Sequence, residues 1–372
     1  MKIAIDATGA VGKRTGVGIY IYNLVEQLSK LDKDNDYLLY LNYFRPGKTN
    51  PFKNNLRAAT NRIPARVQRF LQNNCRLPIE IFTGKIDLFH GPNYFIPPSK
   101  AKRIVTIHDL TFLRYPGTMV AGDAAYYGKY VPKSIEQADH VITISNSTKN
   151  GLVEKLGVPE EKITVTHLAA GKEFKPIEDR ALIDKVLEKY NLEPEFMLTV
   201  CTLEPRKNLI TLIKTLDILK KRGKLNQKLV VVGGSGWKNE ALFSEINRLN
   251  LQEDIILPGY INQADLPYLY NACSVFLFPS FYEGFGIPPL EALSCSAPSI
   301  CSNTSSIPEV VGDAAILIEP KNAELWAEKI ANLLDNPSLQ KELKQKGPLQ
   351  AGKFSWEKTA KETLEVYKKL KE

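Results

Sequence analysis

Two series of short apolar strands, separated by a charged stretch, constrain the fold of this chain of 372 residues more than any other feature. Segments with helical periodicity lie between the strands, which are near-continuous runs of valine, isoleucine and leucine. The first series occupies residues 3–7, 37–41, 86–89, 104–107, 141–144 and 163–166, and the second occupies residues 196–201, 229–232, 255–257, 275–278, 299–301 and 315–318. Such runs are typical of parallel sheets covered by helices on both faces. The pattern predicts an α/β protein with two Rossmann-like, doubly wound parallel-sheet domains that face a cleft.

The charged stretch Lys172–Glu195 marks the predicted boundary between the domains. We expect an N-terminal domain at residues 1–171 and a C-terminal domain at residues 172–353, a division that suits the length of the chain. Residues 354–372 read as a separate amphipathic helix, because apolar residues recur there at helical spacing and Ser355 is a suitable N-cap.

Basic residues are concentrated in residues 51–103. This segment holds ten lysines and arginines against two acids, a surplus equal to the net charge of +8 of the whole chain. Arg62, Arg66 and Arg69 fall on one face of a predicted helix, which would contact an anionic membrane or a phosphorylated acceptor. The alternative is a solvated basic face. No aromatic and basic reading motif accompanies the charge, so nucleic acid is not an expected partner.

The chain has neither a long apolar run nor a signal-peptide pattern. No stretch approaches the roughly 18 uninterrupted apolar residues of a membrane helix, and Asp6 interrupts the first apolar segment before a signal-peptide core could form. We expect a cytoplasmic protein, with contact to the cytoplasmic face of a membrane as an addition that the basic segment suggests.

The segment Glu283-Gly-Phe-Gly-Ile-Pro-Pro-Leu-Glu291 combines a strand end, a glycine loop and a predicted helix start. Gly284 and Gly286 let backbone N–H groups approach a ligand, and the helix start favours an anion. Carboxylates repel a phosphate, so we expect Glu283 and Glu291 to accept hydrogen bonds from the hydroxyls of two sugars. A nucleotide-sugar carries both sugars around a diphosphate. The alternative is that Glu291 complements the dipole in the first helical turn and Glu283 is a loop acid.

A second cluster, Arg206 and Lys207, stands between a predicted strand and a helix. These cations would clamp a diphosphate, and solvated surface charge is the alternative reading. Both this cluster and the glutamate segment follow the carboxyl ends of strands in one domain, where open α/β sheets bind ligands.

The N-terminal domain offers a glycine loop and one histidine as candidate site residues. Gly16 and Gly18 do not form a dinucleotide fingerprint, because Ile21 stands where the third glycine would be, which argues against an NAD-dependent oxidoreductase. His108 ends a predicted strand on the cleft side, where it would contact a donor hydroxyl or shuttle a proton; a structural role is the alternative. The acidic cluster Asp32–Asp36 reads as a turn, and we expect no metal site.

Taken together, these motifs resemble glycosyltransferase family 4 and its two-domain GT-B architecture over essentially the whole chain. The specific motif is the pair of glutamates seven residues apart. Weaker ones include the glycine loop at 16–18, His108-Asp109, Ile144–Ser147, Leu203–Asn208 and the glycine turns at 231–234 and 257–260.

The resemblance implies a role for each matching residue. His108, Arg206, Lys207 and Glu283 would be catalytic, with the two cations holding the diphosphate and Glu283 orienting the donor hexose. Glu291 would bind the ribose. The implied donor-binding residues are Gly16, Gly18, Ser145, Gly233, Gly234, Gly259, Tyr260, Gly284, Phe285, Gly286 and Glu291. The tail helix would return to the N-terminal domain.

The activity implied by the resemblance is a retaining, metal-independent hexosyl transfer with no cofactor besides the nucleotide-sugar co-substrate. The motifs resemble those of bacterial mannosyltransferases of polysaccharide and lipopolysaccharide assembly. That resemblance makes GDP-mannose the expected donor and a glycan or lipid-linked sugar the expected acceptor. A UDP-sugar-dependent glucosyl- or N-acetylglucosaminyltransferase and a non-catalytic nucleotide-sugar-binding protein remain alternatives.

Overall fold

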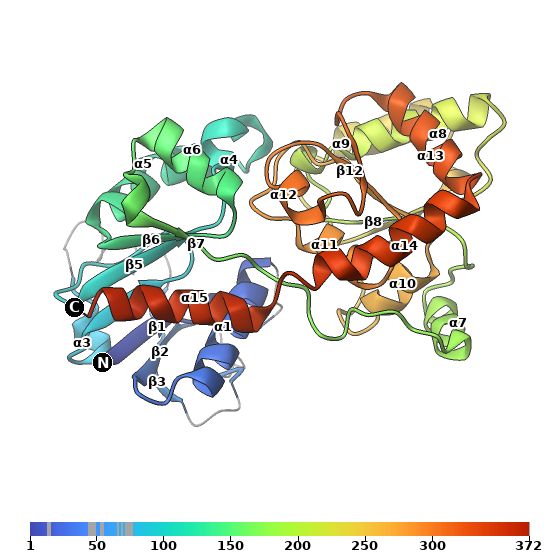
Figure 1. The fold of residues 1–372 in the computed structure, drawn as a ribbon. Coiled ribbons are helices and arrows are strands. Elements are labelled where there is room, and N and C mark those ends of the chain that lie inside the picture. Colours follow the sequence, from blue (N-terminus) through green and yellow to red (C-terminus); the bar gives the residue numbers. More distant parts are fainter. Residues whose placement is uncertain are drawn as a thin grey trace. The chain divides into compact units, whose positions relative to one another are not determined.

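The structure is a computed structural model that describes residues 1–12, 16–43, 50–52, 56–64, 67, 70 and 77–371. The chain forms two compact units, each built on one parallel sheet (Figure 1). Unit 1 comprises Met1–Leu113, Gly122–Leu168 and Ser355–Glu372, and unit 2 comprises Arg114–Ala121 and Ala169–Phe354. A short segment from the first half of the sequence, Arg114–Ala121, therefore packs with the second unit.

The sheet of unit 1 has seven strands in the order β3-β2-β1-β4-β5-β6-β7, all paired in parallel. The strands are β1 (Lys2–Asp6), β2 (Asp36–Asn42), β3 (Arg57–Asn61), β4 (Leu88–Gly91), β5 (Lys102–Ile107), β6 (His140–Thr143) and β7 (Ile163–Val165). Six of them are the predicted ones. The seventh, β3, was not predicted, because this largely exposed edge strand has no apolar run.

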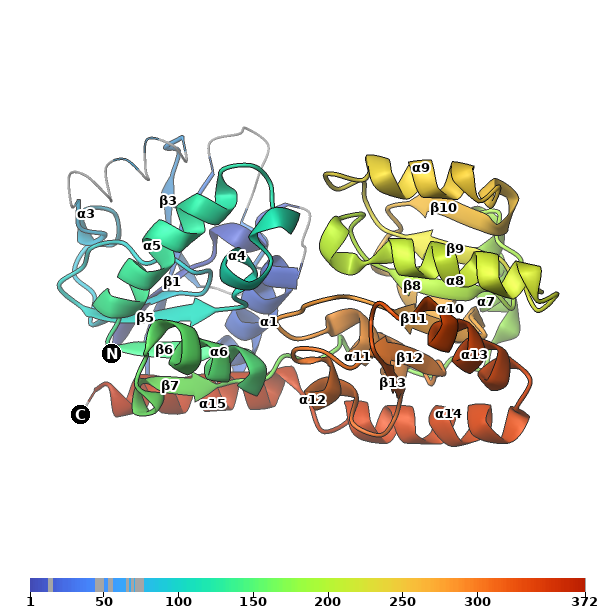
Figure 2. The ribbon, with the colours of Figure 1, turned by 90° about the horizontal axis from the view of Figure 1, so that it is seen from above.

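Helices cover both faces of this sheet. α1 (Gly16–Leu31) and α15 (Trp356–Lys369) pack together on one face, and α5 (Asp123–Gln137) and α6 (Asn146–Leu156) lie on the other (Figures 1 and 2). The Oγ of Ser355 accepts a hydrogen bond from the Lys358 N–H at 3.1 Å, as expected of an N-cap. The predicted return of the tail helix to the N-terminal domain is confirmed.

The sheet of unit 2 has six parallel strands in the order β10-β9-β8-β11-β12-β13. They are β8 (Met197–Val200), β9 (Leu229–Val232), β10 (Ile255–Gly259), β11 (Val275–Phe278), β12 (Ser299–Ser302) and β13 (Ile316–Ile318), all of them predicted to within two residues. Their side chains are largely buried because helices cover both faces. This agreement confirms two doubly wound parallel-sheet domains.

On one face of the second sheet lie α8 (Leu209–Lys221), α9 (Glu240–Arg248) and α13 (Ala323–Leu334); on the other lie α10 (Leu266–Ala272), α11 (Ile287–Ser294) and α14 (Pro337–Ala351) (Figure 1). The remaining α-helices of the described residues are α3 (Glu80–Thr83), α4 (Thr111–Arg114), α7 (Arg180–Lys189) and α12 (Ile307–Val311). Among the described residues, no helix is long and apolar enough to cross a bilayer.

The structure corrects two local predictions. Arg62 follows β3 directly and is not helical, because the chain has only just left the edge of the sheet; Arg66 and Arg69 lie outside the described residues. Gly16 and Gly18 belong to the first turn of α1 rather than to a loop before it. Their backbone N–H groups are therefore helix N-terminal groups.

Candidate active site

The carboxyl ends of β8 and β11 bring the two predicted clusters of unit 2 together. These strands pair at the centre of the sheet, where the strand order reverses, and open α/β sheets bind ligands at such a point. A single 3₁₀ turn, Pro205–Lys207, follows β8, and the loop that carries Glu283 follows β11. The loops are joined by a hydrogen bond from the Phe281 N–H to the Arg206 carbonyl at 2.9 Å.

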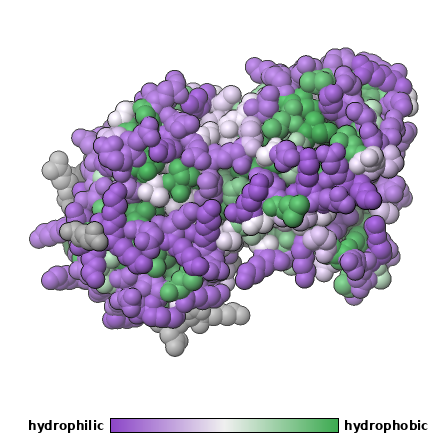
Figure 3. Space-filling view, in the orientation of Figure 1, coloured by the Kyte–Doolittle hydropathy of each residue, from purple (hydrophilic) through white to green (hydrophobic). Residues whose placement is uncertain are grey.

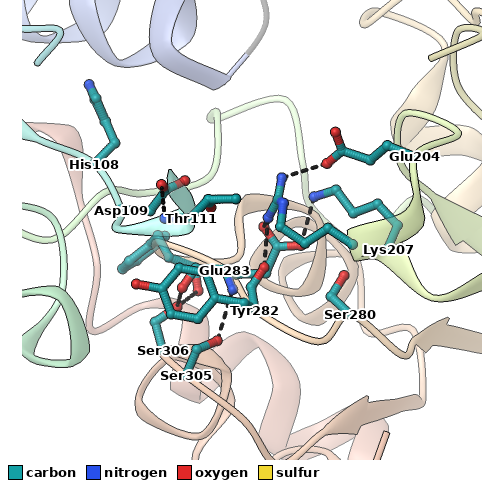
Figure 4. A network of polar contacts seen from close by, with 12 residues as sticks. His108, Asp109, Thr111, Glu204, Lys207, Ser280, Tyr282, Glu283, Ser305 and Ser306 are labelled. Atoms are coloured by element: carbon teal, nitrogen blue, oxygen red, sulfur yellow. Dashed lines mark hydrogen bonds and ion pairs between the residues drawn. The ribbon is translucent and has the colours of Figure 1, made fainter. Parts of the chain in front are cut away.

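Arg206, Lys207 and Glu283 form an ion cluster between these loops (Figure 4). Lys207 Nζ lies 2.6 Å from Glu283 Oε1, and Arg206 Nη1 lies 3.0 Å from Glu283 Oε2. The other guanidinium nitrogen, Nη2, donates to Glu204 Oε1 at 2.6 Å. The cluster is largely withdrawn from solvent: the side chains of Arg206, Lys207 and Glu283 are 15%, 13% and 10% exposed.

The cations determine the charge of Glu283. Burial by itself raises the pKa of this carboxyl, but Lys207 and Arg206 outweigh burial and lower the pKa to about 2. Glu283 is therefore a carboxylate over the whole physiological range. Its backbone is held as firmly as its side chain, since the Glu283 N–H donates to Ser305 Oγ at 2.9 Å and Ser306 Oγ donates to the Glu283 carbonyl at 3.0 Å.

Four residues that support this cluster were not among the predicted site residues: Glu204, Asn208, Ser305 and Ser306. Asn208 adopts φ 55°, a left-handed conformation that asparagine tolerates. Its Nδ2 donates to the carbonyls of Pro279 and Pro320 at 3.0 and 2.7 Å and so connects three loops. Asn208 could have been found from the sequence, because it stands just before a predicted helix. The two serines follow β12, and nothing in the sequence indicates their contact with Glu283.

Glu291 lies deeper in unit 2 than predicted. It is the fifth residue of α11, hence in the second turn rather than the first, and it is 5% exposed. Tyr270 on α10 donates a hydrogen bond to Glu291 Oε2 at 3.0 Å. Burial, with a smaller contribution from Glu173, raises the pKa of Glu291 to about 8. A dipole-complementing role in the first turn therefore does not apply.

The glycines at the ends of strands serve close backbone packing. Gly233 has φ 153°, and a Cβ there would lie 1.8 Å from the Cys201 carbonyl oxygen. Gly236, which was not among the predicted residues, has the same function: a Cβ there would lie 2.3 Å from the Leu203 carbonyl oxygen. The loop after β9 therefore packs tightly on the segment that leads to Arg206.

The remaining predicted residues of unit 2 lie in the same group of loops. Gly234 has open space around it, and Gly259, with φ 77°, ends β10 and accepts a hydrogen bond from the Gly233 N–H at 2.9 Å. Tyr260 follows and is 55% exposed. Gly284 and Phe285 are buried, and Gly286 adopts φ 120° where α11 begins.

In unit 1, His108 is fixed at the end of β5 as a neutral imidazole. Its Nε2 lies 2.8 Å from the Pro92 carbonyl oxygen, which can only accept, so Nε2 carries the proton and Nδ1 is the acceptor. Burial lowers the pKa of His108 despite this hydrogen bond and the nearby Asp109. The ring packs edge-on against Tyr20, with centroids 5.2 Å apart.

Two other residues of unit 1 have local structural roles. Ser145 is fully buried, and its Oγ caps α6 by accepting from the Thr148 N–H at 3.1 Å; its contact with a donor stays a prediction. Asp32 accepts from Tyr37 Oη at 2.6 Å and from Asn35 Nδ2 at 2.7 Å, which is the turn chemistry expected of this acidic stretch. The described residues contain no group of three or more acids, cysteines and histidines that could hold a metal ion.

Comparison with known proteins connects these features to one family. Residues 14–169 match the model described as Glycosyltransferase Family 4, and residues 182–350 match that of Glycosyl transferases group 1. O-antigen chain mannosyltransferase B of Escherichia coli is 33% identical over 284 residues, which are 76% of this chain and 74% of that protein.

Two further relatives show how far the similarity extends. The serotype-specific mannosyltransferase WbdA of Escherichia coli is 32% identical over 72% of this chain, which spans 34% of WbdA, about a third of its length. Sucrose-phosphate synthase from Thermosynechococcus elongatus has the same fold, with a TM-score of 0.79 over 99% of this chain and 98% of that one at 19% identity. The chain belongs to glycosyltransferase family 4 and is a glycosyltransferase of the GT-B fold.

Proposed function

We propose that this glycosyltransferase transfers mannose from GDP-mannose, with retention of configuration, to a glycan or lipid-linked acceptor in cell-surface polysaccharide assembly. The observation that carries the proposal is the buried cluster of Arg206, Lys207 and Glu283 at the point of unit 2 where the strand order reverses. The mannosyltransferase names of the relatives support mannose as the sugar.

In this proposal the two cations bind the donor's diphosphate. Arg206 and Lys207 are aligned in advance by Glu283, so little reorganisation is needed when charge develops on the leaving GDP. Charge-assisted hydrogen bonds from a guanidinium and an ammonium to phosphate oxygens are strong. The Glu283 carboxylate, ionised because its pKa is about 2, accepts hydrogen bonds from the hexose hydroxyls. Gly284, Phe285 and Gly286 present their backbone N–H groups to the same sugar.

Glu291 is proposed to bind the ribose of the donor. A carboxyl with a pKa of about 8 is partly protonated at neutral pH. Hydrogen bonds from two ribose hydroxyls favour the charged form, so donor binding would lower this pKa. Binding of the ribose and ionisation of Glu291 are then linked. The turns at Gly233, Gly234, Gly259 and Tyr260 would border the nucleobase.

The N-terminal residues are proposed to act on the transferred sugar. The acceptor nitrogen of His108, Nδ1, would receive a hydrogen bond from a hexose hydroxyl, and the N–H groups of Gly16 and Gly18 would meet a phosphate. The bond from the anomeric carbon to the diphosphate oxygen breaks, and the acceptor oxygen attacks the same face. The acceptor's proton passes to the departing phosphate oxygen, so no protein nucleophile and no metal ion are required.

We propose a cytoplasmic location, because the donor is a cytoplasmic metabolite, with peripheral contact to the membrane that carries a lipid-linked acceptor. Arg62, Arg66 and Arg69 are the proposed contact. Arg62 is exposed, and the roles of Arg66 and Arg69 are proposed from the sequence alone.

A thermal-shift panel tests the donor assignment, because a ligand that binds only the folded state raises the melting temperature. GDP-mannose and GDP are expected to stabilise the wild type, by about 2.7 kcal/mol at a concentration of about 100 times Kd. UDP-glucose and UDP-N-acetylglucosamine are expected to have no effect. Stabilisation by a UDP-sugar instead would support the alternative donors, and no stabilisation by any of the four would refute a nucleotide-sugar site.

Product release distinguishes an enzyme from a non-catalytic binding protein. With saturating GDP-mannose and a mannose-containing acceptor glycan, a transferase releases GDP in many turnovers and lengthens the glycan. Donor binding without either product would identify a binding protein.

A further inference from the structure

Unit 1 contains a cavity of about 810 Å³ at the amino edge of its sheet, opposite the edge that carries His108. The start of β5, the chain just before β4, Met1, and Leu370 and Lys371 directly after α15 line it (Figures 1 and 2). β5 runs from Lys102 to Ile107, so five steps of about 3.3 Å place the two edges about 17 Å apart. The cavity is therefore separate from the site residues of unit 1.

Cations outnumber acids in the lining. Lys100, Lys102, Arg103 and Lys371 face Asp87 and Asp139, a surplus of two positive charges. Three of these cations belong to the basic segment that stood out in the sequence. Part of the positive charge of residues 51–103 therefore lies around this cavity.

The two acids of the lining already have partners. Asp87 Oδ2 accepts from the Lys2 N–H at 2.7 Å. Asp139 Oδ2 accepts from the Arg103 N–H at 2.8 Å, and its Oδ1 lies 3.4 Å from Lys102 Nζ. Backbone N–H groups therefore hold both carboxylates, and within the described residues only Lys102 of the four cations forms an ion pair with one of them.

Three cations of the cavity have no protein acceptor within the described part of the chain. Arg103 Nε is buried without a hydrogen-bond partner, although nearly all buried donors in proteins have one. Lys100 and Lys371 are exposed and form no ion pair with any described residue. A guanidinium and two exposed ammonium groups that line one cavity suit the several acceptor oxygens of a phosphate.

We propose that this cavity is an anion site that binds a phosphate group, supplied by an anionic phospholipid headgroup or by a free phosphate. Electrostatic attraction between the cations of the cavity and the phosphate drives this binding. The face of unit 1 seen in Figure 3 is largely hydrophilic, with apolar side chains in small separate areas, which does not suit insertion into lipid. Binding should accordingly weaken as ionic strength rises.

The test compares two doubly substituted proteins of equal net charge. Lys100→Glu/Lys371→Glu reverses two exposed cations of the cavity, and Lys185→Glu/Lys341→Glu reverses two exposed lysines of unit 2 as the control. All four positions are exposed, so both proteins should melt at the wild-type temperature. One arm measures co-sedimentation with phosphatidylcholine vesicles with and without phosphatidylglycerol, and the other measures calorimetric binding of inorganic phosphate at constant ionic strength.

Wild type and control are expected to bind in at least one arm, and the cavity variant to bind at least about tenfold more weakly. Binding to phosphatidylglycerol vesicles alone identifies a lipid headgroup, and binding of inorganic phosphate identifies a soluble source. Equal binding by the cavity variant and the control, or no binding by the wild type in either arm, would overturn the proposal.

Discussion

Replacing Glu283 with glutamine removes one negative charge from the ion cluster of unit 2 and leaves its shape. In the folded protein Arg206 and Lys207 lower the pKa of Glu283 from 4.5 to about 2. A shift of this size corresponds to about 3 kcal/mol of stability at pH 7. Glu283→Gln should therefore reduce the free energy of unfolding by about 3 kcal/mol, since it leaves two largely buried cations short of a partner.

The pH dependence identifies the cause. The folded-state pKa lies below the unfolded one, so the contribution of Glu283 is complete above about pH 5 and is lost as the pH falls toward 2. Urea unfolding of wild type and variant should differ by about 3 kcal/mol at pH 7 and by about 2 kcal/mol less at pH 3. A difference that is the same at both pH values, or absent at pH 7, would refute the reasoning.

Three further predictions concern other parts of the same account. Glu291 has a folded-state pKa of about 8, above the unfolded value of 4.5, so its ionisation opposes folding increasingly between these pH values. Urea unfolding should show Glu291→Gln more stable than the wild type by about 5 kcal/mol at pH 9 and little different at pH 4, and a pH-independent difference would contradict this. Gly233→Ala should destabilise the fold by more than about 2 kcal/mol, because its Cβ would clash with the Cys201 carbonyl oxygen. Gly234→Ala, with open space around the glycine, should be nearly neutral, and equal melting temperatures of the two variants would refute the packing argument. Excess EDTA should leave the rate of sugar transfer unchanged, and a strict requirement for added Mg²⁺ or Mn²⁺ would rule out the metal-free mechanism.

The sequence predicted the two sheets well because parallel strands buried on both faces must be continuously apolar. It failed where burial does not impose a pattern. The edge strand β3, Arg57–Asn61, pairs with β2 but has mostly exposed side chains, so its sequence carries no strand signal. The prediction that Arg62 is helical was wrong for a related reason, since the apolar and basic periodicity was extended back to the residue that directly follows this strand.

The candidate site was predictable where the chemistry is local. Arg206, Lys207 and Glu283 each stand within a few residues of a strand's carboxyl end, and parallel strands bring such ends to one edge of a sheet. The supports of the cluster depend on contacts between distant segments. Ser305 bonds to the Glu283 backbone from the loop after another strand, and the depth of Glu291 follows from its packing against Tyr270. Neither contact could be predicted from the spacing of residues along the chain.

The central claim, that Lys207 and its neighbours hold the diphosphate of a nucleotide-sugar during transfer, is tested most directly by one comparison of rates. Mannosyl transfer from GDP-mannose would be measured for the wild type, for Lys207→Met and for Lys185→Met, an exposed lysine on α7 that serves as the control. Loss of an aligned cation should lower kcat/KM by about 100- to 1,000-fold in Lys207→Met, with the control at the wild-type rate. Equal kcat/KM for the two variants would contradict the account.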